Sequence, residues 1–287
     1  MERQIYYSQR SGKNKNFGKI DFDTLKKIYI TLFEMFYSKD YFLGTFGSYT
    51  HNDFRDEIQG PLGDEYEIAR ILFLKLRKEN LWPINKYISL YEEDDLFDII
   101  EYCYDNISVP VIEYGEDVFI GITQNIKGYS STDGQKEFRI EINRHLKDYK
   151  EGYELDNNGN IVKIAEFGLE PLLEAKLPSK DPRIYKNVEQ AITKYRNRNS
   201  SLVDRREAVR NIADVFEYIR PQLKNVIKKK DESDLFQIAN EFGIRHNNKQ
   251  QKIDYNEDIW LSWMFYYYLA TIHAFIRILN REGLLSE

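Results

Sequence analysis

The chain has 287 residues, of which 42% are hydrophobic and 31% are charged, and its formal net charge at pH 7 is −6. This composition is typical of a folded soluble protein and fits one large domain or two ordinary ones, of which we expect two. The single cysteine, Cys103, excludes an internal disulfide and a multi-cysteine zinc site, which indicates a reducing compartment. The polar opening stretch from Met1 to Lys19 does not resemble a secretion signal, so we expect a cytoplasmic protein.

Charge is distributed unevenly along the chain. The stretch from Lys176 to Lys230 holds 15 Lys and Arg residues against 6 Asp and Glu residues, a net charge of +9. The residues before it are strongly acidic. A basic stretch of this kind fits a surface that binds a polyanion, and it equally fits a solvated helix face or a surface that docks the acidic half.

The first half of the chain mixes predicted helices with short strands. Apolar residues at spacings of three and four predict amphipathic helices over 21–38 and 65–79 and a helical stripe over 96–103. The β-branched stretches 108–114 and 118–122 predict strands.

A helix and a hairpin complete this half. The pattern predicts a helix over 135–149 and then strands over 152–155 and 161–164. The five residues Asp-Asn-Asn-Gly-Asn that join these strands predict a tight turn, because Asn-Gly accepts positive φ at low cost.

Three stretches of the first half carry a resemblance to a known family. They are Tyr7-Ser-Gln-Arg-Ser-Gly12, Phe138-Arg-Ile-Glu-Ile-Asn-Arg144 and Gly152-Tyr-Glu-Leu155. Together they resemble the N-terminal domain of AbiJ-like abortive-infection proteins of bacterial phage defence, over about half of the chain. The resemblance implies a defence setting and supplies no catalytic residue.

The charge balance reverses at the segment from Leu177 to Pro182, which holds two prolines and several turn-forming residues. We therefore place a domain boundary here, between an α+β domain over 1–176 and an all-α domain over 183–287.

The second half is predicted to be helical throughout. Helices are expected over 185–196, over 202–220 with Pro221 as its end, and over 233–241. The last helix is expected to start from a capping box formed by Asp254 and Glu257 and to continue to Leu279.

The last helix is apolar nearly all the way round and is long enough to span a bilayer. Three consecutive tyrosines, His273 and Arg277 would all add to the cost of insertion. A central helix of a bundle, or a helix shared by two copies in a dimer, would bury the apolar residues without this cost of insertion, so we expect no membrane span. His273 and Arg277 would suit a proton-and-anion pair, but a core histidine is the favoured interpretation.

The helices of the second half, with the break Gly243-Ile-Arg-His-Asn-Asn-Lys249 before the last one, resemble the HEPN domain, an all-helical module of RNases in defence and toxin systems. The resemblance implies a metal-independent site of Arg and His, usually at a dimer interface. His246 is the matching histidine. The family's arginine lies four to six residues before the histidine, whereas here the nearest one is Arg245. This departure fits either a rearranged centre or a domain that has lost activity.

These residues suggest a chemistry for RNA cleavage. His246 would take the proton of a ribose 2′-hydroxyl, and Arg245 would neutralise charge that develops on the phosphate. The residues expected to bind RNA are Asn247, Asn248, Lys249, Arg210 and Arg206. No nucleotide-phosphate loop and no zinc-ligand spacing occurs in the sequence, so neither a metal nor a cofactor is expected.

Two rival interpretations remain. Arg245 and His246 fit an ordinary polar turn in which Arg245 pairs with Glu241 or Asp254. The whole chain also fits a non-catalytic sensor and dimerisation protein of a defence system. If the chain is an endoribonuclease, its expected partners are RNA such as tRNA or mRNA, a second copy bound through the C-terminal helices, and a phage-derived trigger.

Overall fold

The computed structural model describes residues 6–11, 18–48, 58–117, 121–166, 168–224, 226–227 and 256–285. These residues form two compact units, Met1–Val162 and Lys163–Glu287. The described structure is mainly helical with small antiparallel hairpins, which confirms the mainly α fold class. Each unit has its own hydrophobic core.

The helices of the first unit enclose a core rich in aromatic rings. They are α1 (Tyr7–Arg10), α2 (Phe22–Ser38), α3 (Glu65–Leu76), α4 (Ile84–Tyr87), the 3₁₀ turn Ile88–Leu90, α5 (Glu93–Asn106) and α6 (Ser131–Leu146). The predicted periodicities are confirmed where they place Leu25, Tyr29 and Leu96 in the core. α2 begins where expected because Asp21 accepts a 2.8 Å hydrogen bond from the backbone N–H of Thr24.

The strands of the first unit pair only as hairpins among the described residues. They are β1 (Gly47–Ser48) with β2 (Ile58–Gln59), β3 (Val109–Asp117) with β4 (Gly121–Ser130), and β5 (Tyr153–Leu155) with β6 (Ile161–Lys163). β3 was expected, but β4 starts later and runs further than the predicted 118–122. The predicted turn between β5 and β6 is confirmed, with Gly159 at a φ of +85°.

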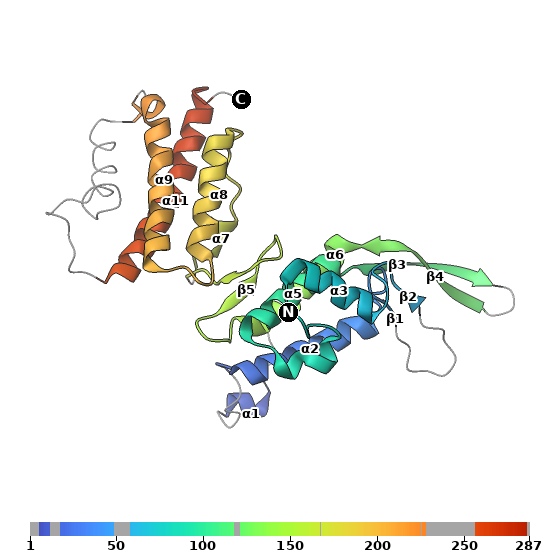
Figure 1. The fold of residues 1–287 in the computed structure, drawn as a ribbon. Helices are drawn as coiled ribbons and strands as arrows, with labels where there is room; N and C mark the ends of the chain where they lie inside the picture. Colours follow the sequence, from blue (N-terminus) through green and yellow to red (C-terminus); the bar gives the residue numbers. More distant parts are fainter. Residues whose placement is uncertain are drawn as a thin grey trace. The chain divides into compact units, whose positions relative to one another are not determined.

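The second unit is a bundle of long helices (Figure 1). Among the described residues, its long helices are α8 (Pro182–Arg196), α9 (Leu202–Leu223) and α11 (Glu257–Arg281), and the short helix α7 (Glu170–Glu174) precedes them. Side chains such as Ile184, Ile212 and Leu269 are fully buried between these helices. The division between the units lies before the predicted boundary at 177–182, because Ala165 and Leu173 already pack in the second core.

Several predicted helix ends are wrong, and one predicted helix lies outside the described residues. α3 ends at Leu76 and not at 79, and α6 runs over Ser131–Leu146 and not over 135–149. α9 continues past Pro221 to Leu223, since Leu223 is fully buried and anchors the last turn. α11 is capped by Asn256, which accepts a hydrogen bond of 3.3 Å from the backbone N–H of Ile259. The predicted helix 233–241 is not among the described residues.

α11 is long and apolar enough to cross a membrane by length and composition. Half of its apolar stretch is buried inside the structure, and side chains such as Leu261, Phe265 and Ile272 form the middle of the second core. This is the burial expected for the central helix of a bundle.

Candidate nucleic-acid interface

Most of the site predicted from the sequence lies outside the described residues, namely Arg245, His246, Asn247, Asn248 and Lys249. Arg206 and Arg210 are described, and both lie on α9. The part of the candidate interface that the structure shows is therefore the edge of α9 that carries these arginines, together with the first turn of α11.

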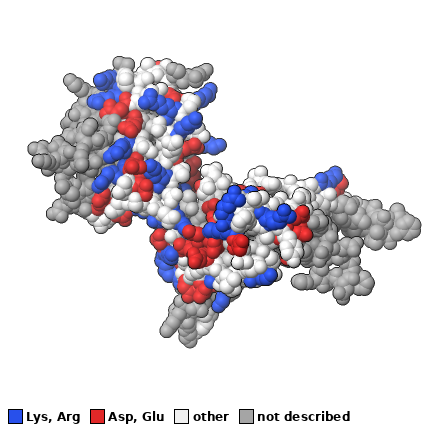
Figure 2. All heavy atoms as spheres, viewed as in Figure 1, with Lys and Arg blue, Asp and Glu red and all other residues white. Residues whose placement is uncertain are grey.

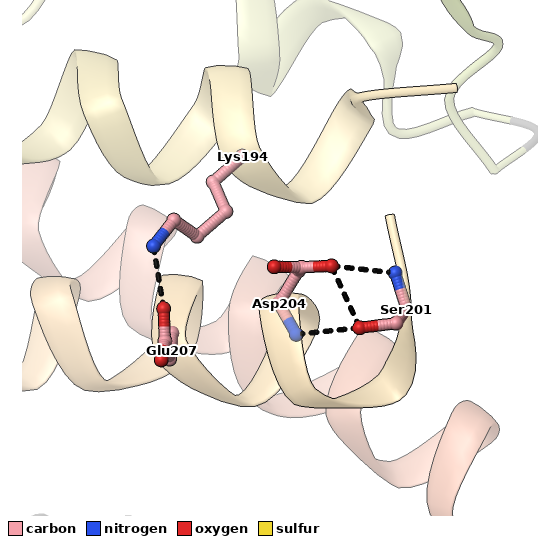
Figure 3. A network of polar contacts seen from close by, with 4 residues as sticks. All are labelled: Lys194, Ser201, Asp204 and Glu207. Carbon is pink, nitrogen blue, oxygen red and sulfur yellow. Dashed lines mark hydrogen bonds and ion pairs between the residues drawn. The ribbon is translucent and has the colours of Figure 1, made fainter. Parts of the chain in front are cut away.

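The start of α9 is fixed by a capping box (Figure 3). The backbone N–H of Asp204 donates to Ser201 Oγ at 3.2 Å, and the backbone N–H of Ser201 donates to Asp204 Oδ2 at 2.9 Å. Hydrogen bonds from Ser201 lower the pKa of Asp204, so this carboxylate is ionised at neutral pH. Since the cap fixes where the helix begins, it also fixes the positions of Arg205 and Arg206 in its first turns.

Ion pairs join the first turns of α9 and α11. Arg206 pairs with Glu257, and Arg205 pairs with Asp258. The two helices therefore start at the same end of the bundle and run in the same direction (Figure 1). Arg210 lies one turn after Arg206 on the same edge of α9, where it is exposed.

On the face of the second unit that Figure 2 shows, Lys and Arg side chains lie among Asp and Glu side chains. Besides the two pairs at the start of α11, Lys194 pairs with Glu207 at 2.5 Å and Arg220 with Glu217 at 3.3 Å. For these residues the interpretation as a solvated helix face is the better one. A phosphate that approaches Arg206 must compete with the carboxylate of Glu257.

A polar cavity of about 880 Å³ opens between α8 and the start of α9. Its lining is rich in amide and hydroxyl side chains, among them Gln190, Thr193, Asn197, Ser200 and Asn211. Lys194 reaches across from α8 to Glu207 beside it (Figure 3). At 100° per residue, Glu207 and Asn211 lie about 100° around α9 from Arg206 and Arg210, and neither arginine lines the cavity, so the cavity and the arginines are separate features.

A cluster of hydroxyl groups around the single carboxylate of Glu166 lies near the start of α11, and the sequence did not predict it. Glu166 Oε1 accepts hydrogen bonds from Ser262 Oγ at 2.6 Å and from Tyr195 Oη at 3.2 Å. Burial alone would raise the pKa of Glu166, but hydrogen bonds, among them those from Ser262 and Tyr195, outweigh it and hold this pKa below its ordinary value. Glu166 is thus an ionised acceptor whose donors hold it in place.

Arg205 connects this cluster to the start of α9. Its guanidinium lies 5.4 Å from the centre of the Tyr195 ring, and this ring stacks on Phe265 with centres 3.9 Å apart. No sequence signal links these residues, since Glu166 and Ser262 lie 96 positions apart. The cluster orients Arg205, and through Arg205 the first turn of α11.

The other reactive groups that are described lie in the cores. His273 is buried, and its pKa is lowered by burial and by the charge of Arg277, so it is neutral at pH 7. Cys103 is fully buried, which raises the pKa of its thiol to about 12. Among the described residues, no group of three or more His, Cys, Asp and Glu is placed to hold a metal ion.

Comparison of the chain with family models, with curated proteins and with solved structures found no match.

Proposed function

We propose that this chain is a metal-independent endoribonuclease of the HEPN type, which cuts RNA such as tRNA or mRNA in the cytoplasm during bacterial defence against phage. The observation that carries the proposal is the pair Arg245 and His246, which stands in the sequence between two helices of one bundle, α9 and α11. An imidazole that titrates near neutral pH beside a permanent cation can cleave RNA without a metal.

The proposed reaction is an internal transfer of the phosphodiester. His246 takes the proton of the ribose 2′-hydroxyl, and the 2′-oxygen attacks the neighbouring phosphorus. The bond from phosphorus to the 5′-oxygen breaks, and this oxygen takes up a proton. The products are a 2′,3′-cyclic phosphate and a 5′-hydroxyl. Arg245 neutralises the charge that develops on the phosphate oxygens.

RNA is held in this proposal by the neighbours of the pair and by α9. Asn247, Asn248 and Lys249 orient the nucleotide next to the cut. Arg206 and Arg210 contact phosphates along one edge of α9, where they stand one turn apart. Because Arg206 is paired with Glu257, it binds a phosphate only by releasing this carboxylate.

A homodimer through the C-terminal helices belongs to the same proposal. The outer side of α11 exposes Ile259 to 63%, Trp260 to 38% and Trp263 to 41%. Trp263 stacks on Tyr267 with ring centres 5.4 Å apart, so the side chains form an aromatic stripe along the helix. Exposed stripes of this kind are typical of surfaces that bind another protein.

The same stripe favours a second candidate function, a non-catalytic sensor that dimerises through α11 and responds to a phage-derived trigger. In this alternative the ion pairs of Arg205 and Arg206 serve only to hold the bundle together.

Purified protein incubated with total RNA or tRNA in the presence of a chelator separates the two functions. We expect cleavage that His246→Ala abolishes while the helical circular dichroism stays unchanged. His145→Ala removes an imidazole from α6 in the other unit and serves as the matched control. Cleavage that persists in His246→Ala overturns the site, and the absence of cleavage under all conditions favours the sensor.

A further inference from the structure

The first unit contains an open groove of about 490 Å³ between the outer side of α3 and the segment that runs from residue 78 to 87. Its walls include the aromatic side chains of Tyr66, Phe73, Trp82 and Tyr87. The volume lies within the range of about 300–1,000 Å³ that small-molecule sites occupy. None of these residues takes part in the proposed nuclease.

The apolar wall on α3 is exposed to water in the part of the chain that the structure describes. Ile68 and Leu72 are buried in the core, whereas Tyr66 is 81% exposed, Phe73 42% and Leu74 65%. Large apolar side chains that gather around a hollow mark a binding surface, while single exposed ones do not. A ligand in the groove would cover them.

The back of the groove is anchored in the core. Trp82 is only 5% exposed, and its ring centre lies 4.7 Å from that of Phe46. Lys78 is held by Asp95 at 2.9 Å and by Asp98 at 2.8 Å on α5. The indole N–H of Trp82 has no hydrogen-bond partner among the described residues. This wall is therefore fixed in place before a ligand arrives.

Of the cations that line the groove, Lys78 is the one held by Asp95 and Asp98, and Arg70 is the other. Arg70 stands between Tyr66 and Phe73 along the outer side of α3 and lines the groove. It forms no ion pair with another described residue. Lys86 lies outside the lining, with its Nζ 4.9 Å from the centre of the Tyr87 ring. One acid, Glu79, also lines the groove, while Glu67 is held in the capping box of α3 with Asp64.

We propose that this groove binds a nucleotide, with the base against the aromatic walls and the phosphate on Arg70. Stacking of a base on an aromatic ring contributes about 1–3 kcal/mol and does not depend on which base is present. A guanidinium suits a phosphate because it donates two parallel hydrogen bonds. An uncharged apolar peptide would use the walls without Arg70.

This inference does not rest on the proposed nuclease, since no residue is shared. The nucleotide could come from the free pool or from the end of an RNA, and both offer the same base and phosphate. The comparison of AMP with the 5′-phosphorylated dinucleotide pApA separates the two sources. The source is the free pool if AMP binds at least as tightly as pApA, and an RNA end if pApA binds more tightly.

Isothermal titration of the full chain with AMP and with adenosine tests the proposal. We expect AMP to bind at least tenfold more tightly than adenosine, and Arg70→Met to remove this preference. Phe73→Ala should weaken both ligands. Arg77→Met removes the cation at the C-cap of α3, which lies outside the lining, and should leave both affinities unchanged.

The location can be read from Trp82, which becomes the only tryptophan when Trp260 and Trp263 are replaced by phenylalanine. AMP should change the fluorescence of Trp82, and the dissociation constant from this change should equal the one from isothermal titration. The proposal is overturned if neither AMP nor pApA binds at millimolar concentration, if adenosine binds as tightly as AMP, or if Arg77→Met weakens AMP as much as Arg70→Met does.

Discussion

Arg206 on α9 and Glu257 on α11 form an ion pair that joins the first turns of the two helices. The pair lies at the end of the bundle where α11 begins and involves one of the arginines expected to contact RNA. It can therefore be a structural link, a gate for phosphate binding, or both. The two roles predict different results when Glu257 is neutralised.

Glu257→Gln should cost little stability and should strengthen RNA binding. Both side chains are about one third exposed, at 39% and 33%, so we expect the free energy of unfolding to fall by only about 0.2–1 kcal/mol. Arg206 is released for a phosphate, so the affinity for a short RNA should rise in fluorescence anisotropy. Glu217→Gln, which removes the same charge beside Arg220, is the control. An equal rise in both variants would show an effect of net charge alone.

Glu166 should make stability depend on pH in the acidic range. Its pKa is lower in the folded chain than the ordinary value of 4.5, so its contribution is complete above pH 4.5 and is lost as the pH falls toward the folded pKa. Urea unfolding of the wild type and of Glu166→Gln should show a stability difference at pH 6 that shrinks below pH 4.5. A difference that stays constant from pH 6 to pH 3.5 would contradict this role of the cluster.

Gly159→Ala should destabilise the first unit. Gly159 has a φ of +85°, and a Cβ atom there would lie 2.5 Å from the ring of Tyr104, which is only 7% exposed. We expect the free energy of unfolding to fall by about 1–3 kcal/mol. Gly168→Ala has a nearly equal φ of +86° and open space around the new Cβ, so it measures the backbone cost alone. The clash is refuted if the two variants lose the same stability.

Two buried tyrosines of the first core should respond in opposite ways to loss of the hydroxyl. Tyr91 donates a hydrogen bond to the carbonyl of Leu81, so Tyr91→Phe should cost about 1 kcal/mol of unfolding free energy. The hydroxyl of Tyr102 has no hydrogen-bond partner among the described residues, so Tyr102→Phe should leave stability unchanged or raise it. Thermal unfolding measures the stability of both variants. A loss of stability in Tyr102→Phe equal to that in Tyr91→Phe would show that the Tyr102 hydroxyl has a hydrogen-bond partner.

The local parts of the fold could be predicted from the sequence. The apolar period of α2 and α5 placed Tyr29 and Leu96 in the core, and the Asn-Gly pair placed the turn after β5. These features depend only on neighbours within a few residues. The end of α9 could not be predicted from Pro221, because burial of Leu223 keeps the last turn helical.

The parts of the sites that join distant segments could not be predicted. Nothing in the sequence links Glu166 to Ser262, or Arg206 to Glu257, since hydrophobic periodicity shows which side of a helix is buried and not what covers it. The same holds for the groove, where the outer side of α3 meets the segment of Trp82. Arg245 and His246 remain a prediction from the sequence, because they lie outside the described residues.

The chemistry of the cut ends shows whether the ribose 2′-hydroxyl attacks the phosphate. RNA incubated with the protein in a chelator should yield fragments that end in a 2′,3′-cyclic phosphate and begin with a 5′-hydroxyl, as measured by mass spectrometry. A substrate with 2′-deoxyribose at the cut position should stay intact, because His246 then has no 2′-hydroxyl to deprotonate. Fragments with 5′-phosphate ends, or cleavage of the deoxy substrate at the same position, would rule out attack by the 2′-hydroxyl.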